Sequence, residues 1–154
     1  MRPSTPAARS ALPAAEIAAR LRLSATRLAR RLRQESGAGL SPSQLSALAV
    51  VDNHGPVTLG ALAEHERVAP PTITKVVSKL ECDGLVIRTP DPSDRRVCRV
   101  EVSAAGADLL QEIRRRKTAW LTARITELDP ESQRRLAEAL DVLDDLISGT
   151  GPST

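Results

Sequence analysis

The 154-residue chain has almost no aromatic side chains: it contains no Phe, no Tyr and a single Trp, Trp120. Its core must therefore be built from aliphatic residues. No apolar run approaches the roughly 20 residues that a helix needs to cross a bilayer, so the sequence predicts no membrane span. The N-terminus carries Arg2 and Arg9 without a continuous apolar segment, which argues against a secretory signal peptide. We expect a cytoplasmic protein.

Residues that carry catalysis or bind metal ions are also scarce. The two cysteines, Cys82 and Cys98, do not make a disulfide framework. The two histidines, His54 and His65, are eleven positions apart, are expected in a loop and on a short helix, and lie in no ligand-like cluster. Zinc usually needs three or four such residues. Without a glycine-rich phosphate loop or a nucleophile motif either, the sequence predicts no enzyme, no metal and no cofactor.

The charges are unevenly divided along the chain, whose formal net charge is +3. Residues 1–102 hold 15 Lys and Arg against 10 Asp and Glu, whereas residues 103–154 hold 7 against 9. A basic excess favours an anionic partner, and here the excess lies in the first two-thirds of the chain. The length suits one domain, or one small domain with an association element.

The spacing of apolar residues and the positions of turn-forming and capping residues predict five segments. These are a flexible tail over residues 1–12, a helix over 13–36, a compact unit over 41–102, two helices over 103–148, and a second tail over 149–154. The first helix is strongly cationic. A solvated arginine face, phosphate contacts, or acidic residues of another helix would each explain its charge. Ser103 and Asp129 are expected to cap the two later helices.

The compact unit is expected to contain three helices and a hairpin. Ser41 and Gln44 form a capping box at the start of the first helix. Thr58 is an N-cap for a short helix over residues 58–66. The third helix occupies residues 69–84: two prolines suit its first turn, and Gly84 can end it in a left-handed conformation.

The helix over residues 69–84 has one apolar face and one polar face. Its apolar positions follow helical spacing and are expected to be buried: Ile73, Val76, Val77 and Leu80. The outer face can hydrogen-bond and holds no acidic residue; it consists of Thr72, Thr74, Lys75, Ser78 and Lys79. Taken alone, an ordinary solvated helix face explains these residues equally well.

A basic hairpin follows. Residues 85–90 and 97–102 are predicted strands, and the loop between them begins with an Asp-Pro turn signal. Arg95 and Arg96 lie at or near its tip, where arginines can enter the minor groove of DNA. Asp94 is expected to orient one of their guanidinium groups through a bidentate bond. A surface loop with a local ion pair is the alternative.

In this order, the motifs resemble the bacterial MarR family of transcription regulators. The resemblance is carried by the spacing of Leu59, Leu62 and Ala63, and by Thr72-Ile-Thr-Lys75, Leu80-Glu-x-Asp-Gly-Leu-Val-Ile-Arg88, Asp91-Pro-Ser-Asp-Arg-Arg96 and Val102-Ser-Ala-Ala-Gly106. It implies a mainly α fold with a small β-hairpin wing, that is, a winged helix-turn-helix with long N- and C-terminal dimerisation helices. It also implies a homodimer that binds double-stranded DNA.

The resemblance assigns roles to these segments. The polar face of the helix over residues 69–84 would lie in the major groove, and Arg95 and Arg96 would place the wing on the minor groove. A two-fold dimer would set its recognition helices about one DNA turn apart, roughly 34 Å, which predicts a pseudo-palindromic operator. The expected function is a transcriptional regulator, most often a repressor in this family. The alternative is a winged-helix protein-interaction module or a nonspecific DNA-architectural protein.

The same resemblance raises the questions of an effector and of redox sensing. Some members bind small aromatic acids between the dimerisation helices and the DNA-binding lobe. Trp120 and the arginines of the first helix are candidates to line such a pocket, although a core or interface position explains Trp120 equally well. Peroxide-sensing members usually carry a cysteine in the first helix, which this chain lacks. Cys82 and Cys98 are therefore expected to be small buried or half-buried residues, although oxidation of either would disturb DNA binding.

Overall fold

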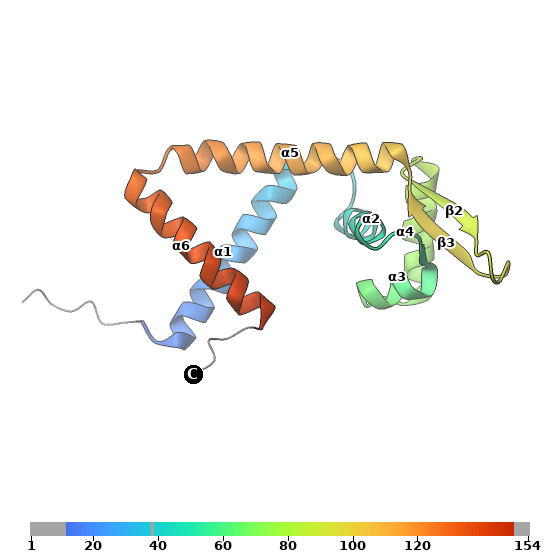
Figure 1. Ribbon diagram of the computed structural model, residues 1–154, viewed down its shortest axis with the longest axis horizontal. Coiled ribbons are helices and arrows are strands. Elements are labelled where there is room, and N and C mark those ends of the chain that lie inside the picture. The colour runs from blue at the N-terminus through green and yellow to red at the C-terminus, as the bar shows by residue number, and fades with distance from the viewer. Residues whose placement is uncertain (1–11, 38, 150–154) are drawn as a thin grey trace, which may run out of the picture. The chain divides into compact units, whose positions relative to one another are not determined.

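The computed structural model describes residues 12–37 and 39–149, and it divides into two units, 1–37 and 38–154, which are treated separately. The predicted tails fall almost entirely outside the described residues. The first unit contains α1, Ala14–Glu35, which follows Pro13 and carries no buried residue. The second unit contains all the other labelled elements (Figure 1).

The helix α2, Pro42–His54, begins at the predicted capping box. The Gln44 backbone N–H donates to Ser41 Oγ over 3.2 Å, and the Ser41 N–H donates to Gln44 Oε1 over 2.7 Å. These reciprocal bonds satisfy two backbone donors that the start of a helix leaves free. Gly55 ends the helix at a φ of 70°, a conformation that favours glycine.

The helices α3, Leu59–Glu66, and α4, Pro70–Cys82, follow in close succession. Thr58 Oγ1 accepts the Ala61 N–H over 3.1 Å, as expected of the predicted N-cap. Gly84 follows α4 at a φ of 72°. The turn between α3 and α4 contains Arg67, which is the only non-glycine residue with a positive φ (53°) among the described residues.

The left-handed conformation of Arg67 predicts a gain in stability on replacement by glycine. Relief of strain is worth roughly 1–2 kcal/mol, and the added freedom of the unfolded chain costs roughly 0.4–1 kcal/mol. Arg67→Gly should therefore stabilise the fold by about 0.5–1 kcal/mol, measured by urea denaturation. Gly84→Ala is the matched opposite, because its new methyl would meet nothing within 4 Å and would add only backbone strain. An equal change in the free energy of unfolding of the two variants would contradict the assignment of backbone strain to Arg67.

Three short strands form one antiparallel sheet in the order β1-β3-β2. They are β1, Val57–Thr58, β2, Val86–Pro90, and β3, Cys98–Val102. The hairpin of β2 and β3 agrees with the prediction to within a residue at each start. The strand β1 was not predicted, because two residues cannot show alternation. It is recognisable only by its pairing with β3, where Val57 lies opposite Val100.

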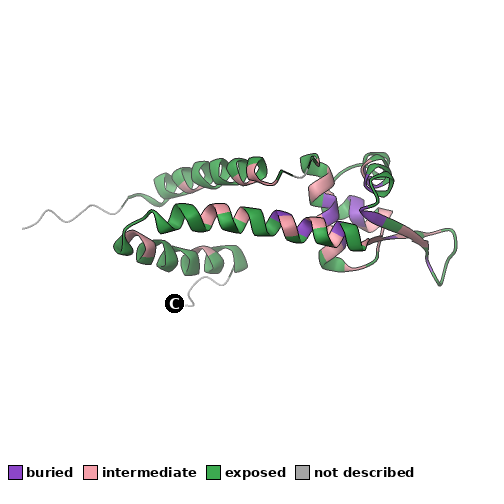
Figure 2. Ribbon diagram, turned by 90° about the horizontal axis from the view of Figure 1, so that it is seen from above, coloured by how far each residue is buried: buried purple, intermediate pink, exposed green. Residues whose placement is uncertain are grey.

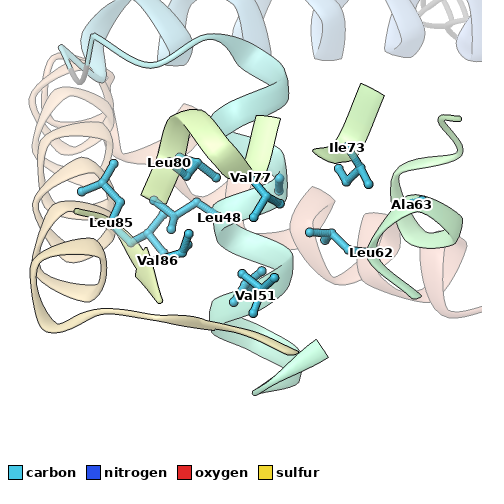
Figure 3. Close-up of a cluster of buried hydrophobic side chains, with 12 residues drawn as sticks. Leu48, Val51, Leu62, Ala63, Ile73, Val77, Leu80, Leu85 and Val86 are labelled. Carbon is cyan, nitrogen blue, oxygen red and sulfur yellow. The ribbon is translucent and has the colours of Figure 1, made fainter. Parts of the chain in front are cut away.

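One aliphatic core joins α2, α3, α4, the hairpin and the start of α5 (Figure 3). Its largest fully buried side chains are Leu48, Val51, Leu62, Ile73, Val77, Leu80 and Val100. The side chains labelled in Figure 3 come from α2, α3, α4 and the start of the hairpin, and none of them is aromatic. Val76 was predicted to be buried but is only partly covered, because it packs against the edge of this cluster. The core fixes α4 with its polar face outward.

The first turn of the helix α5, Ala104–Thr126, packs closely against the start of the hairpin. Ser103 Oγ accepts the Gly106 N–H over 3.0 Å and donates to the Gly84 carbonyl over 2.6 Å. A Cβ added to Gly106 would lie 2.1 Å from the Leu85 carbonyl oxygen, so only glycine permits this approach. The buried residues of α5 all lie in its first half: Gly106, Leu110 and Ile113.

The last helix, α6, Pro130–Ser148, is capped by Asp129, whose carboxylate accepts the Ser132 N–H over 2.9 Å. None of its residues is buried within the described chain, and the helix that leads to the C-terminus is mostly green in Figure 2. Its apolar side chains include Leu140, Leu146 and Ile147, which are 52%, 66% and 81% exposed. None of the described helices is both long enough and apolar enough to cross a membrane.

Candidate nucleic-acid interface

The polar face of α4 is exposed along its whole length. The five residues singled out from the sequence all lie on it: Thr72, Thr74, Lys75, Ser78 and Lys79. The opposite face contributes Ile73, Val77 and Leu80 to the core. Because these three side chains are packed in the core, the orientation of α4 is fixed and its polar face points outward.

Three of these five side chains already have partners. Thr74 Oγ1 donates to the Pro70 carbonyl over 2.9 Å, and Ser78 Oγ accepts a hydrogen bond from Arg88 over 2.8 Å. Lys79 Nζ lies 2.8 Å from Asp83 Oδ1, and this hydrogen bond and the charge of Asp83 raise the pKa of Lys79.

Thr72 and Lys75 are different, because neither side chain has a hydrogen bond or ion pair to another described residue. Both are exposed on the outer face of α4. Lys75 is therefore the cation of this face that can reach a phosphate or a base edge without breaking an internal contact.

Arg88 of β2 ties the hairpin to α4. Its guanidinium donates to Ser78 Oγ over 2.8 Å, and its Nε lies 3.1 Å from Glu81 Oε2. The Nε contact is an ion pair outside hydrogen-bond geometry, because this buried atom makes no hydrogen bond in the described chain. The sequence marked Arg88 only as part of a motif. Its signal was that it is the one basic residue of the predicted strand over residues 85–90.

The wing loop is organised around the carboxylate of Asp91, which is only 6% exposed. One oxygen accepts the N–H groups of Ser93 and Asp94, over 2.7 and 3.3 Å, and the Ser93 hydroxyl. The other oxygen accepts a hydrogen bond from Arg99 of β3. The Ser93 hydroxyl, followed by Arg99, holds the pKa of Asp91 far below its ordinary range. Its contribution to stability is therefore fully present at neutral pH, and it is lost progressively as the pH falls below the ordinary pKa of an aspartate towards its lowered pKa in the fold.

Asp94 does not make the guanidinium contact that was expected of it. Its carboxylate accepts the backbone N–H of Arg96 over 2.9 Å, and no ion pair joins it to Arg95 or Arg96 in the described chain. Aspartate readily bonds a backbone N–H two residues ahead, and this local bond competes with pairing to a side chain. Arg95 and Arg96 both stay exposed at the end of the hairpin. The wing therefore presents two cations on a loop that Asp91 and Asp94 shape from within.

Comparisons with known proteins agree with this architecture. The MarR family profile matches residues 40–98, which reach from the start of α2 into β3. A helix-turn-helix-type transcriptional regulator of Mycobacterium leprae is 42% identical over 134 residues, covering 86% of this chain and 94% of that protein. The chain belongs to the MarR family. The resemblance inferred from the sequence motifs is confirmed.

Solved structures of MarR-family type share the fold. A MarR family protein from Bacillus stearothermophilus is 25% identical with a TM-score of 0.71, covering 87% of this chain and 94% of that one. A Staphylococcus aureus MepR variant, solved bound to an oligodeoxyribonucleotide, is 17% identical with a TM-score of 0.69 over 84% of this chain and 97% of its own. The second likeness shows the fold alone. Together they confirm the predicted fold class, a mainly α winged helix-turn-helix with a small sheet.

Trp120, the candidate effector residue of this MarR-family chain, lies in the second half of α5 and is half-buried. The guanidinium of Arg124 lies 5.8 Å from its ring centroid, within the range of a cation–π contact. The arginines named with it lie on α1, which belongs to the first unit. The effector pocket therefore stays a prediction.

The cysteines differ from expectation. Cys82 and Cys98 are free and exposed, so the prediction that they are buried or half-buried is wrong. Cys82 is the last residue of α4, beyond the core position Leu80, and Cys98 pairs with Pro90 at the wing end of the hairpin. Both positions lie outside the packed cluster.

Proposed function

We propose that this MarR-family protein is a sequence-specific regulator that binds double-stranded DNA as a homodimer, in most settings as a repressor. The observation that carries the proposal is the joining of two surfaces. Arg88 ties the exposed polar face of α4 to a wing that presents Arg95 and Arg96. A family of transcription regulators implies a binding protein rather than an enzyme, and such a regulator works on chromosomal DNA in the cytoplasm.

The α4 face would enter the major groove, whose width admits a helix. Thr72 and Lys75 are free to meet base edges or phosphates, whereas Thr74, Ser78 and Lys79 would exchange or share their internal partners. The wing would follow the minor groove, whose negative potential favours arginine. Asp94 would help to orient that tip through its bond to the Arg96 backbone.

The proposed dimer is supported by apolar surface that a single chain leaves uncovered. Leu140, Leu146 and Ile147 of α6 are at least half exposed, and α1 carries no buried residue. Pairing two chains through their terminal helices would remove this surface from water. A two-fold pair with recognition helices roughly 34 Å apart would read a pseudo-palindromic operator. A small effector near Trp120 would act by changing that spacing.

A gel-shift assay on the DNA upstream of the protein's own gene tests the proposal. We expect a complex that survives an excess of random DNA and contains two chains per operator. Equal competition by random DNA would favour an architectural protein instead. Absence of a complex at low salt would favour a protein-interaction module, because nonspecific binding alone should appear under those conditions.

Lys75→Ala should weaken operator binding by roughly 5- to 150-fold if Lys75 contacts a base, and should relax specificity at that position. Lys79, which pairs with Asp83 within the chain, is proposed to contact a phosphate rather than a base. Lys79→Ala should therefore weaken binding to all DNA sequences alike and lower the slope of log K against log salt by about one. Fluorescence anisotropy at several salt concentrations measures both quantities. Unchanged affinity in Lys75→Ala would remove α4 from the interface.

A further inference from the structure

The fold brings the chain's two histidines into contact. The imidazole centroids of His54 and His65 lie 4.5 Å apart, with ring planes inclined by 37°. His54 is the last residue of α2 rather than a loop residue, and His65 lies in the last turn of α3. Both side chains are exposed. Their separation in the sequence concealed this pairing, because it depends on how α2 and α3 pack.

The two helices that carry the rings are held rigidly together. Leu48 and Val51 of α2 belong to the same core as Leu62 and Ala63 of α3 (Figure 3). A hydrogen bond of 2.8 Å from Ser46 Oγ to Glu66 Oε1 adds a polar link between the same helices. A ligand that needs both imidazoles would therefore find them already close, at little cost in ordering the chain.

The position also favours a cation. The end of a helix carries a partial negative charge on its free carbonyl groups, and each histidine lies in a last turn. Imidazole nitrogens are preferred ligands of zinc, nickel and copper. Two rings bound side by side to one ion, with metal–nitrogen bonds of about 2.1 Å, would have centroids roughly 4.5–5.2 Å apart, from right-angled to tetrahedral coordination.

We infer that His54 and His65 form a binding site for one divalent late transition-metal ion, such as Ni²⁺ or Zn²⁺. Water completes the coordination, since no group of three or more potential protein ligands occurs among the described residues. Such a site is open and exchangeable, unlike a four-ligand structural zinc site. A bound ion links the end of α2 to the last turn of α3. His54 and His65 are not among the residues that we assign to DNA binding.

Isothermal titration of the untagged full-length chain at neutral pH tests the site directly. The parent protein should carry Cys82→Ser and Cys98→Ser, because both exposed thiols bind the same metals. NiCl₂ and ZnCl₂ should each bind at one ion per chain. An excess of about ten times the Kd should raise the Tm by roughly 3–6 °C. MgCl₂ should do neither, because Mg²⁺ prefers oxygen ligands.

His54→Ala and His65→Ala should each weaken Ni²⁺ binding at least about tenfold, because each variant removes one of the two imidazole ligands. Both side chains are exposed, so the metal-free variants should keep the parent Tm. His54→Gln and His65→Gln serve if either alanine variant misfolds. Unchanged affinity in either single variant, or no Tm shift of the parent in millimolar NiCl₂, would overturn the site.

Discussion

Gly106→Ala should lower the Tm of the protein by roughly 6–12 °C, the largest stability loss that we expect from adding one methyl group. A Cβ at this position would lie 2.1 Å from the Leu85 carbonyl oxygen and 2.9 Å from Val102 Cγ2. The first contact is to backbone, so a rotamer change cannot relieve it. The first turn of α5 must move away, at a cost of roughly 3 kcal/mol, and each kcal/mol is worth about 2–4 °C in a chain of this size.

The displacement should spread beyond one contact. The Leu85 carbonyl also accepts the Ser103 N–H over 3.0 Å, and Ser103 Oγ bonds the Gly84 carbonyl. These two hydrogen bonds hold the start of α5 to the turn between α4 and β2. If that turn shifts with α5, operator affinity should fall as well.

Gly60→Ala is the matched control for this loss. Gly60 lies in the first turn of α3, and an added Cβ would meet only Thr58 Oγ1, at 3.9 Å. It should change stability by between zero and about +1 kcal/mol, because alanine restricts the unfolded chain more than glycine does. Differential scanning calorimetry at one protein concentration compares the two variants. If Gly106→Ala and Gly60→Ala had the same Tm, the close approach of Gly106 to the Leu85 carbonyl would not be needed for stability.

Local signals in the sequence predicted the helices well, because each signal acts over three or four residues. The Ser41 box, the Ser103 and Asp129 caps, and the glycine after α4 each satisfy backbone groups nearby. The apolar spacing of α4 then predicted which face would be buried, apart from Val76 at the edge of the core. The same spacing left the polar face exposed, so the candidate residues could be named before the fold was known.

Contacts between distant residues were not predictable in the same way. Asp91 was recognised only as a turn initiator, yet it is the carboxylate that pairs with Arg99 across the hairpin. Asp94 was assigned a guanidinium partner but bonds a backbone N–H two residues ahead. The adjacent arginines in the sequence suggested a guanidinium partner, whereas the geometry of the turn favours the backbone N–H of Arg96. The Arg88 bridge to α4 and the His54–His65 pair likewise depend on packing that no local pattern encodes.

Replacing Arg95 and Arg96 together with alanine should weaken operator binding by roughly 100-fold, while leaving the Tm and the proposed dimer unchanged. Both side chains are exposed and neither has an ion pair in the described chain, so their loss removes no internal support. The loop keeps its shape through Asp91, whose partners are Ser93, the Asp94 backbone and Arg99. A groove contact by each arginine accounts for about tenfold, within the 1–3 kcal/mol typical of such contacts.

The salt dependence should distinguish groove contacts from a general loss of charge. If each arginine displaces one counterion, the slope of log K against log salt should fall by about 1.8. Arg115→Ala with Arg116→Ala on α5 removes the same charge from side chains that both pair with Glu112. That control should keep its slope, because Arg115 and Arg116 lie on α5, outside both the polar face of α4 and the wing that are proposed to contact DNA. Equal losses in the two double variants would mean that the wing acts only through net charge, and the minor-groove assignment of Arg95 and Arg96 would fail.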